Sequence, residues 1–202
     1  MIRLVKRLKI ILFCSLPLPG TGEEQCLLLA CLNFASSGIV NMKTDAGAAG
    51  DGVTDDTAAF KEVFESGKDN PGRFGEARFI YIPPGTYLIR EPIVWGDKKK
   101  FIRGDGVDRT ILRLADNSPD FGNLDQPRVW LNTRRRIHYA QNFLQCICDL
   151  TIDIGAGNPG AIALDYHANK FGGLFNLRIR SSDPQKASAV GMALNMAVPL
   201  YQ

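Results

Sequence analysis

Cysteine is scarce outside the first 42 residues of this sequence. Three of the five cysteines, Cys14, Cys26 and Cys31, lie in that segment, which leaves Cys146 and Cys148 for the rest of the chain. Two cysteines provide no disulfide framework. Their spacing of two places both side chains on one face of a strand, so we expect small core residues and no bridge between them. A C-x-C metal site is the alternative, but no second ligand pair accompanies it.

An excess of charge of one sign is also missing. The net charge is +3, and residues 1–42 contribute four bases and two acids, so the remainder holds 20 bases and 19 acids. Such a body lacks the basic field with which nucleic-acid binders attract phosphates. The basic runs at 98–100 and 134–136 lie in polar stretches and are typical of solvated turns. Nucleic acid is therefore not an expected partner.

Long apolar runs are absent as well. Residues 1–42 resemble an export signal, with a basic stretch from Arg3 to Lys9 and an apolar run over 10–16, but a second apolar run follows an interruption of prolines, glycines and glutamates. Neither run reaches the roughly 20 apolar residues that cross a bilayer. We expect a signal-like or wrongly assigned leader over 1–42, a folded domain over 43–202, no transmembrane span, and a secreted or cell-surface protein.

The first well-specified segment is a small-residue loop over 45–57 that runs into a helix. Asp55 suits a helix N-cap, and carboxylates here complement the positive end of the helix dipole. From Phe60 onward, apolar residues fall at i, i+3 and i+4, and a glycine follows. The pattern predicts one short amphipathic helix over 56–66.

Short β-prone runs divided by proline and glycine come next. They span 79–82, 87–89, 93–95 and 110–114. From Leu144 to Ile154 every even position is apolar, which predicts a strand buried on one face. Strands this short, with no helices between them, favour a sandwich, a barrel or a solenoid.

Two sequence repeats decide among these architectures. Asp149–Asp153 recurs as Asn176–Arg180 at an offset of 27, and Ala161–Leu164 recurs as Gly191–Leu194 at an offset of 30. Interleaved elements that return at nearly the same interval predict a solenoid with one coil per interval. Leu150 should then lie beside Leu177.

The ends of a solenoid need covers, because a coil buries its side chains only by stacking on its neighbours. The helix over 56–66 is well placed to cover the first coil. No such element follows the last apolar strand, so we expect a chain that is cut short at its C-terminus or needs a partner there.

Segments 50–57 and 80–87, with the amphipathic helix between them, resemble the opening of the pectate-lyase superfamily. The closest group is the rhamnogalacturonase and epimerase-like domain, which polygalacturonases, family 55 glucanases and phage tailspikes share. The resemblance covers 43–202. It implies an all-β fold, a right-handed parallel β-helix with a short N-terminal capping α-helix.

The resemblance gives the residues of the first motif structural roles in the turn and the helix cap. These residues are Gly50, Asp51, Gly52, Thr54, Asp55, Asp56 and Thr57. Their types indicate the same, since a tight loop that enters a helix requires small residues and caps. A dinucleotide-binding loop is the alternative, but no apolar strand leads into these glycines and their spacing does not fit.

The resemblance further implies an active groove along the outer face of the parallel sheets. Hydrolases place paired carboxylates there, whereas lyases use calcium and a basic side chain. In relatives these residues lie in later coils, so we expect the catalytic residues beyond Gln202. No cofactor or metal is expected in this chain, and calcium is an option only if the full-length protein is a lyase.

Outward polar residues of the repeats are candidates for contact with sugar. They are Asp149, Asp153, Asp165, Arg178 and Arg180. The 27-residue offset would place Asp149 beside Asn176 and Asp153 beside Arg180, and a solvated cross-coil ladder is the alternative interpretation. The two histidines, His138 and His167, show no serine or cysteine partner pattern and are expected at the surface.

These features favour a carbohydrate-active β-helix protein with a polysaccharide or glycan partner. The first hypothesis is the N-terminal part of a polysaccharide-degrading glycoside hydrolase or pectate/uronate lyase. The second is a non-catalytic glycan-binding β-helix of the tailspike or adhesion type, which should form a trimer and display an aromatic or apolar outer seam. The third is an inactive fragment. Apart from the tailspike case, the sequence predicts no oligomeric state.

Overall fold

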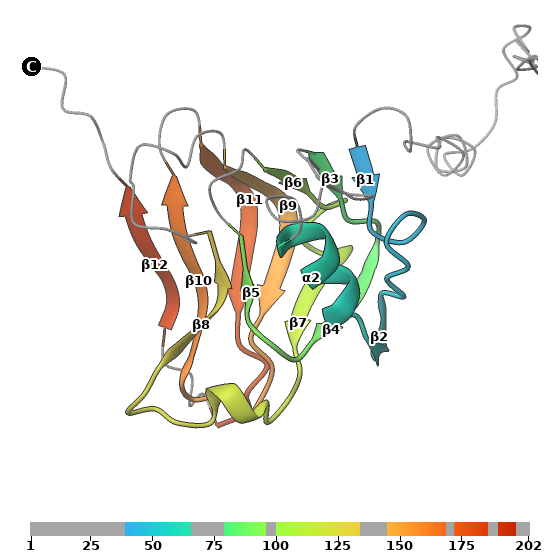
Figure 1. The fold of residues 1–202 in the computed structure, drawn as a ribbon. Helices are drawn as coiled ribbons and strands as arrows, with labels where there is room; N and C mark the ends of the chain where they lie inside the picture. Colours follow the sequence, from blue (N-terminus) through green and yellow to red (C-terminus); the bar gives the residue numbers. More distant parts are fainter. Residues whose placement is uncertain are drawn as a thin grey trace, which may run out of the picture. The chain divides into compact units, whose positions relative to one another are not determined.

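The computed structural model of the chain describes residues 39–65, 79–95, 100–133, 145–168, 172–185 and 190–196. Short parallel strands in two sheets dominate these ranges (Figure 1). The larger sheet holds β1 (Ile39–Asn41), β2 (Asp51–Asp55), β3 (Phe79–Tyr81), β4 (Gly85–Ile89), β6 (Phe101–Arg103), β7 (Thr110–Leu114), β9 (Cys146–Asp153) and β11 (Gly173–Arg180). The smaller sheet holds β5 (Ile93–Val94), β8 (Arg128–Asn132), β10 (Ala161–Ala168) and β12 (Val190–Met196). The described helices are α2 (Thr57–Glu65) and the 3-10 helix η2 (Pro119–Phe121).

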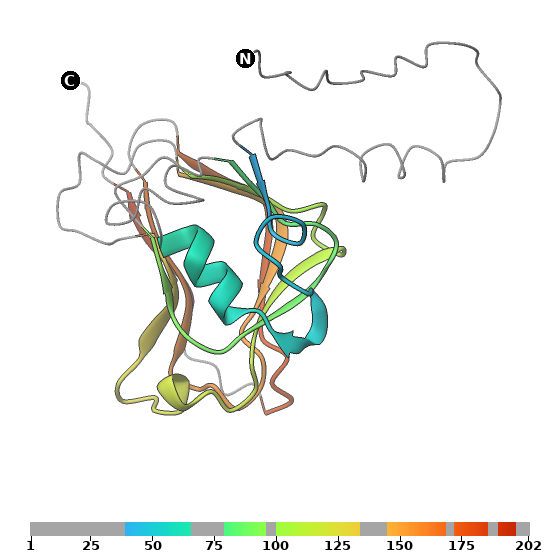
Figure 2. The same ribbon diagram turned by 45° about the vertical axis from the view of Figure 1, so that its right-hand side comes forward.

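From β3 onward, the chain visits the larger sheet and then the smaller one in each coil. Every described strand pair is parallel, and strands of successive coils are neighbours in both sheets. Figure 2 shows the two sheets facing each other. The predicted fold, an all-β right-handed parallel β-helix, is confirmed.

The pairing of the last two coils tests the sequence repeats directly. Leu150 of β9 pairs with Leu177 of β11, so the 27-residue offset is confirmed. Leu164 of β10 pairs with Met192 of β12, which is an offset of 28, so the predicted offset of 30 is wrong. Side chains alternate with a period of two along a strand, and a two-residue error therefore leaves the same residues facing inward.

The coils are unequal in length. Ile80, Ile102, Ile147 and Leu174 stack as one inward row across β3, β6, β9 and β11. Their numbers place successive coils 22, 45 and 27 residues apart. The long coil carries the segments that join β7 to β8 and β8 to β9. Stacking thus depends on the match within the strands, whereas the connections between them vary freely.

Apolar side chains from both sheets fill the interior. Tyr87, Trp130, Leu150 and Tyr166 are among the fully or almost fully buried ones. A single coil could not bury such side chains alone, so the stacking of coils supplies the hydrophobic stabilisation.

Helix α2 covers one end of this interior, as the sequence predicts, and lies across the space between the two sheets (Figures 1 and 2). The ring of Phe60 packs on Tyr87 and that of Phe64 on Trp95, with centroids 5.6 and 5.1 Å apart. The helix begins at Thr57, one residue later than predicted, and its last described residue is Glu65. The predicted end, Ser66, lies outside the described residues.

The segment before α2 contains a strand, β2, where the sequence predicts a loop. β2 pairs with β4 through an irregular register. Gly50, which precedes it, has φ of 61°, and a Cβ there would lie 2.8 Å from the Tyr87 ring, so this position requires glycine. The Asp56 carboxylate accepts hydrogen bonds from the backbone N–H groups of Ala49 and Gly50 at 2.6 and 3.1 Å. Its contacts, like those of Gly50, shape the turn.

β1 lies within the range 1–42 that the sequence assigns to a leader. It pairs with β3 from Ile39 to Asn41, so the larger sheet begins before Lys43. The prediction of a leader over residues 1–38 falls outside the described residues. Among the described residues, no helix has the length and apolar character to cross a membrane.

The inward alternation of β9 changes at Asp149. This residue has φ of 59°, and its partner position in β11, Asn176, has φ of 44°. Ile147 lies in the core before this point and Leu150 after it, so the predicted unbroken alternation from Leu144 to Ile154 is wrong. Cys146 and Cys148 lie on the opposite side of the strand from Ile147. Both are buried, as predicted for small core residues, although they lie outside the largest cluster of core side chains.

Candidate functional site

Asp149 and Asn176 occupy equivalent positions in neighbouring coils, as the 27-residue offset predicts. The Asn176 amide donates a hydrogen bond to the Asp149 carboxylate at 3.0 Å. Arg103 of β6 forms an ion pair with the same carboxylate at 3.2 Å. Both turn residues adopt left-handed backbone conformations, which Asn and Asp tolerate better than most residues. Arg103, Asp149 and Asn176 thus form a polar ladder that also stabilises the turn.

Asp153 lies beside Arg180, as predicted, but it is completely buried. Its carboxylate accepts hydrogen bonds from the Arg180 guanidinium at 2.9 Å, the Ser182 hydroxyl at 2.5 Å and the Gly155 N–H at 3.0 Å. Asp153 therefore has no exposed surface for sugar. Its role in the site is to hold the partly exposed guanidinium of Arg180 in place.

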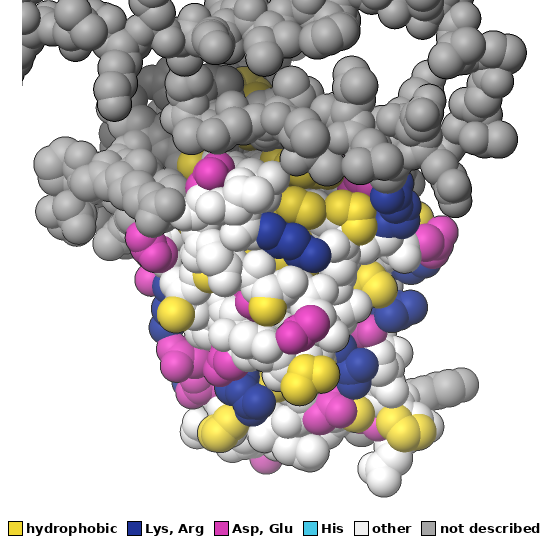
Figure 3. Space-filling model, turned by 90° about the vertical axis from the view of Figure 1, so that its right-hand side faces the viewer, with side chains coloured by type: hydrophobic (Ala, Val, Ile, Leu, Met, Phe, Trp, Pro, Cys, Tyr) yellow, Lys and Arg dark blue, Asp and Glu magenta, His cyan; other side chains and the backbone are white. Residues whose placement is uncertain are grey.

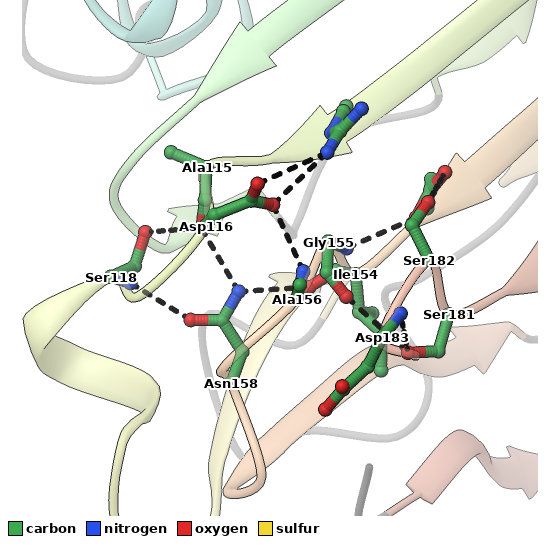
Figure 4. Close-up of polar contacts among 12 residues, drawn as sticks. Ala115, Asp116, Ser118, Ile154, Gly155, Ala156, Asn158, Ser181, Ser182 and Asp183 are labelled. Atoms are coloured by element: carbon green, nitrogen blue, oxygen red, sulfur yellow. Dashed lines mark hydrogen bonds and ion pairs between the residues drawn. The ribbon is translucent and has the colours of Figure 1, made fainter. Parts of the chain in front are cut away.

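The turns that follow β7, β9 and β11 form a polar cluster next to Asp153 (Figure 4). At its centre the Asn158 amide donates to the carbonyl oxygens of Ala115 and Ile154 and accepts from the Ser118 N–H, at 2.8 to 2.9 Å. Asp116 accepts from the Ala156 N–H at 2.9 Å, and this bond, with the Arg113 guanidinium, lowers the pKa of its carboxyl. These contacts satisfy the backbone of the turns, so the cluster is structural.

Arg178 projects from the outer face of β11 and pairs with Asp108 at 2.5 Å. Arg178 shares this face with Arg103, Arg113 and Arg180, and each of these arginines has an aspartate partner. The exposed guanidinium groups can donate hydrogen bonds, but the aspartate partner of each one balances its positive charge.

Asp165 lies apart from the other four candidates, on β10 of the smaller sheet. Its carboxylate is 3.7 Å from Nε2 of His167, and both side chains are largely buried. In register with Asp165 are Asn132 of β8 and Ala193 of β12. The prediction that His167 lies at the surface is wrong, and His138 is outside the described residues. The structure therefore brings together Asp149, Asp153, Arg178 and Arg180, and separates Asp165 from them.

Sequence reasoning missed a row of outward apolar side chains on the larger sheet. We call Phe79, Phe101, Cys146 and Phe175 the outer aromatic strip. Phe79, Phe101, Cys146 and Gly173 are successive Cα partners, and Phe175 lies two residues after Gly173. The sequence signal that could have found this row is the residue types of Asp149 and Asn176, because Asp and Asn tolerate the left-handed conformation. That conformation ends one alternation of side chains and begins another. Without that break, Phe175 appears to face inward with Leu177.

The described residues contain no cluster of three or more histidine, cysteine or acidic side chains that could hold a metal ion. The thiols of the outer face are poor ligands and nucleophiles as they stand. Burial raises the pKa of Cys146, and burial together with the Asp149 charge raises that of Cys148 to about 11. What this face offers is aromatic surface, paired arginines and amide groups.

The family model described as rhamnogalacturonase A/epimerase, pectate lyase-like, matches residues 39–197. A glucan 1,3-beta-glucosidase from Cochliobolus carbonum is 29% identical over 170 residues, which cover 73% of this chain and 20% of that protein. The non-secreted LysM effector LysM19 from Penicillium expansum is 30% identical over 133 residues, which cover 61% of this chain and 10% of that protein.

Among solved structures, a mannuronan C-5 epimerase A-module from Azotobacter vinelandii matches with 21% identity and a TM-score of 0.41, over 77% of this chain and 36% of that one. The chain spans a fifth or less of the length of the two curated relatives. The family match covers the whole described solenoid, from β1 to β12. The chain belongs to the rhamnogalacturonase A/epimerase family of pectate lyase-like proteins.

Proposed function

We propose that this chain is a β-helix segment of a protein that processes a neutral glucan, and that the outer face of the larger sheet contacts the polymer. The observation that carries the proposal is the charge balance of that face. Arg103, Arg178 and Arg180 are each paired with an aspartate, so the face has donors for hydroxyl groups without an excess of positive charge.

This balance bears on the choice between glucan hydrolysis and uronate elimination. A polyuronate carries one carboxylate on every sugar, and a protein that binds it gains from unpaired basic groups. Figure 3 views the molecule from the side of β1 and β2, at one end of the solenoid, and basic and acidic side chains are interspersed there as well. The similarity to a glucan 1,3-beta-glucosidase supports the same choice.

The described part of the outer face supports binding more directly than catalysis. An inverting hydrolase needs one carboxylic acid and one carboxylate about 6.5 to 9.5 Å apart across the substrate. Asp149 and Asp153 are held in ion pairs and Asp153 is buried, so they do not form such a pair. In the proposed protein, other residues than Asp149 and Asp153 therefore supply the hydrolytic carboxylates, and the outer face of the larger sheet positions the glucan.

Native affinity electrophoresis of the full chain tests the proposed polymer. We expect laminarin, a neutral β-1,3-glucan, to retard the chain, and polygalacturonate to leave its mobility unchanged. Fully methyl-esterified pectin is the matched control, because it has the pectin backbone without its charge. Preferential retardation by polygalacturonate would contradict the proposal and favour a uronate lyase.

Release of reducing ends from laminarin separates an enzyme from a binding module. Retardation with no release of reducing ends would favour the non-catalytic alternative for this chain. The second hypothesis of a tailspike-like protein gains support from the outer aromatic strip, and a trimer in light scattering would favour it over the hydrolase.

Export is part of the same proposal, because a polymeric glucan is met outside the cell. The basic and apolar pattern of residues 3–16 supports it, although two curated relatives are named as non-secreted. Fractionation of cells that express the full chain tests this: the proposal requires the chain in the medium or at the cell surface.

A further inference from the structure

The outer aromatic strip is a row of apolar side chains on the outer face of the larger sheet. Phe79 is 51% exposed and Phe175 59% exposed, and both are among the few large hydrophobic side chains that the described residues leave exposed. Contiguous exposed apolar surface on a soluble domain marks a contact site more often than a scattered single residue does. These rings do not belong to the hydrophobic core cluster of the described residues.

The rings lie in line along the axis of the solenoid. The centroids of Phe79 and Phe101 are 5.7 Å apart, with 41° between the ring planes. Phe101 pairs with Cys146, and Cys146 with Gly173. Since parallel strands lie about 4.8 Å apart, a polymer laid along this axis would pass over Phe79, Phe101 and then the Phe175 ring next to the buried Cys146.

Because Gly173 has no side chain, the ring of Phe175 can lie over it. A Cβ added to Gly173 would lie 2.5 Å from Cε2 and Cζ of Phe175, so the ring lies across the glycine, next to Cys146. The burial of Cys146 and Cys148 fits with this cover. Phe175 therefore extends the row from β6 across β9 to β11.

A polar border adjoins the strip at the turn. Arg103, Asp149 and Asn176 form their ladder there, and Asn176 directly follows Phe175 in the chain. A β-linked glucose unit has a similar division: its ring faces carry C–H groups and its edges carry hydroxyls. Ring faces can stack on aromatic side chains while hydroxyls meet the guanidinium and amide groups.

We infer that the outer aromatic strip is the surface on which a neutral β-glucan stacks, with the polymer running along the solenoid axis and its hydroxyls toward Arg103 and Asn176. This inference rests on the proposed function and adds the position and direction of the polymer. A flat protein partner is the other occupant that such a surface could suit. The paired border groups, spaced along a narrow row, favour the sugar.

The test is laminarin affinity of the full chain, measured by titration calorimetry for the wild type, Phe175→Ala and Phe79→Ala. Each substitution should weaken binding roughly 3- to 10-fold, because it removes one stacking ring. Leu124→Ala is the matched control, since Leu124 is 60% exposed and lies outside the strip. It should bind like the wild type. Phe175→Trp, which keeps an aromatic face, should retain binding.

Gly173→Ala supplies a second variant that removes no ring. Its methyl group should displace the Phe175 ring and weaken laminarin binding, with the circular dichroism spectrum unchanged. Laminarin binding that survives both Phe175→Ala and Gly173→Ala would overturn the inference while leaving the proposed function intact. A wild-type chain that binds no laminarin would overturn both.

Light scattering of the same variants tests whether the strip binds a second copy of the chain instead of a glucan. If the wild type self-associates and Phe175→Ala makes it monomeric without any loss of laminarin affinity, the strip is a contact between copies and the inference fails. A monomeric wild type with the predicted loss of affinity supports it.

Discussion

β9 and β11 each consist of two parts with different outer faces. Before Asp149 and Asn176 the outward side chains are Cys146, Cys148 and Phe175, and after them they are Thr151, Asp153, Arg178 and Arg180. The inner faces are alike, with Ile147 and Leu174 on one side of the break and Leu150, Leu177 and Ile179 on the other. One left-handed residue in each of these two strands thus gives the same solenoid an apolar outer row and a charged one. The comparison separates what holds the coils together from what each face can bind.

The inner rows should dominate stability on both sides of the break. Leu150→Ala removes a fully buried side chain from the second part, and we expect it to lower the free energy of unfolding by about 2 to 5 kcal/mol. Urea denaturation followed by circular dichroism measures this.

Ile147→Val is the comparison for the first part, with an expected cost of about 0.5 to 1.5 kcal/mol. If Leu150→Ala cost no more than Ile147→Val, Leu150 could not be an inward member of the stack.

Removing Asp153 should be the costliest change on the charged outer row. Asp153→Ala leaves Arg180, Ser182 and the Gly155 N–H without their acceptor, and we expect a loss of about 1 to 3 kcal/mol in the same denaturation experiment.

Asp108→Ala is its control, because Asp108 is an exposed partner of Arg178 and its ion pair should contribute less than about 1 kcal/mol. Equal effects of the two substitutions would contradict the distinction between the buried and the exposed carboxylate.

The break itself can be tested at Asn176. Asn176→Ala should cost about 1 to 2 kcal/mol, because alanine resists the left-handed conformation and cannot donate to Asp149.

Asn176→Gly accepts the backbone conformation and should cost a few tenths of a kcal/mol to about 1 kcal/mol. Alanine that is tolerated better than glycine would show that the left-handed turn does not form there.

The smallest effect is expected at the thiols of the apolar row. The pKa of Cys148 is raised to about 11 by burial and the Asp149 charge, so little thiolate is present at pH 8. A thiol reagent should therefore modify the folded chain slowly and the urea-unfolded chain rapidly. Because the folded pKa exceeds the usual value of 9.0, this group favours folding below pH 9, and that contribution is lost as the pH rises through about 11.

A Cys148→Ser chain gives the contribution of Cys148 by difference, since Cys146 remains. Modification of Cys148 as fast in the folded as in the unfolded state would contradict its burial under the apolar row.

Much of the fold could be predicted because a solenoid repeats its pattern along the chain. Leu150 and Leu177 pair as the 27-residue offset required, and the apolar face of Phe60, Val63 and Phe64 formed the covering helix. The outer faces could not be predicted in the same way. Their orientation depends on the backbone conformation at Asp149 and Asn176, which the hydrophobic pattern does not contain.

The candidate site shows the same limit. Asp153 and Arg180 meet as predicted, yet the pattern of charges gave no sign that Asp153 is buried or that each arginine has its own aspartate. The lack of a serine or cysteine partner pattern predicts His167 at the surface, whereas neighbouring coils of the smaller sheet enclose it. Such burial depends on which strands become neighbours, which the sequence around His167 does not determine.

The unequal coils have an evolutionary consequence. Ile102 and Ile147 stack as neighbours although the chain between them is far longer than between Ile80 and Ile102. Segments between strands can therefore be lengthened, exchanged or decorated by duplication and insertion while the inner rows keep their order. A scaffold of this kind can acquire a new ligand by changing a loop, because the stacked inner rows that determine the fold stay the same.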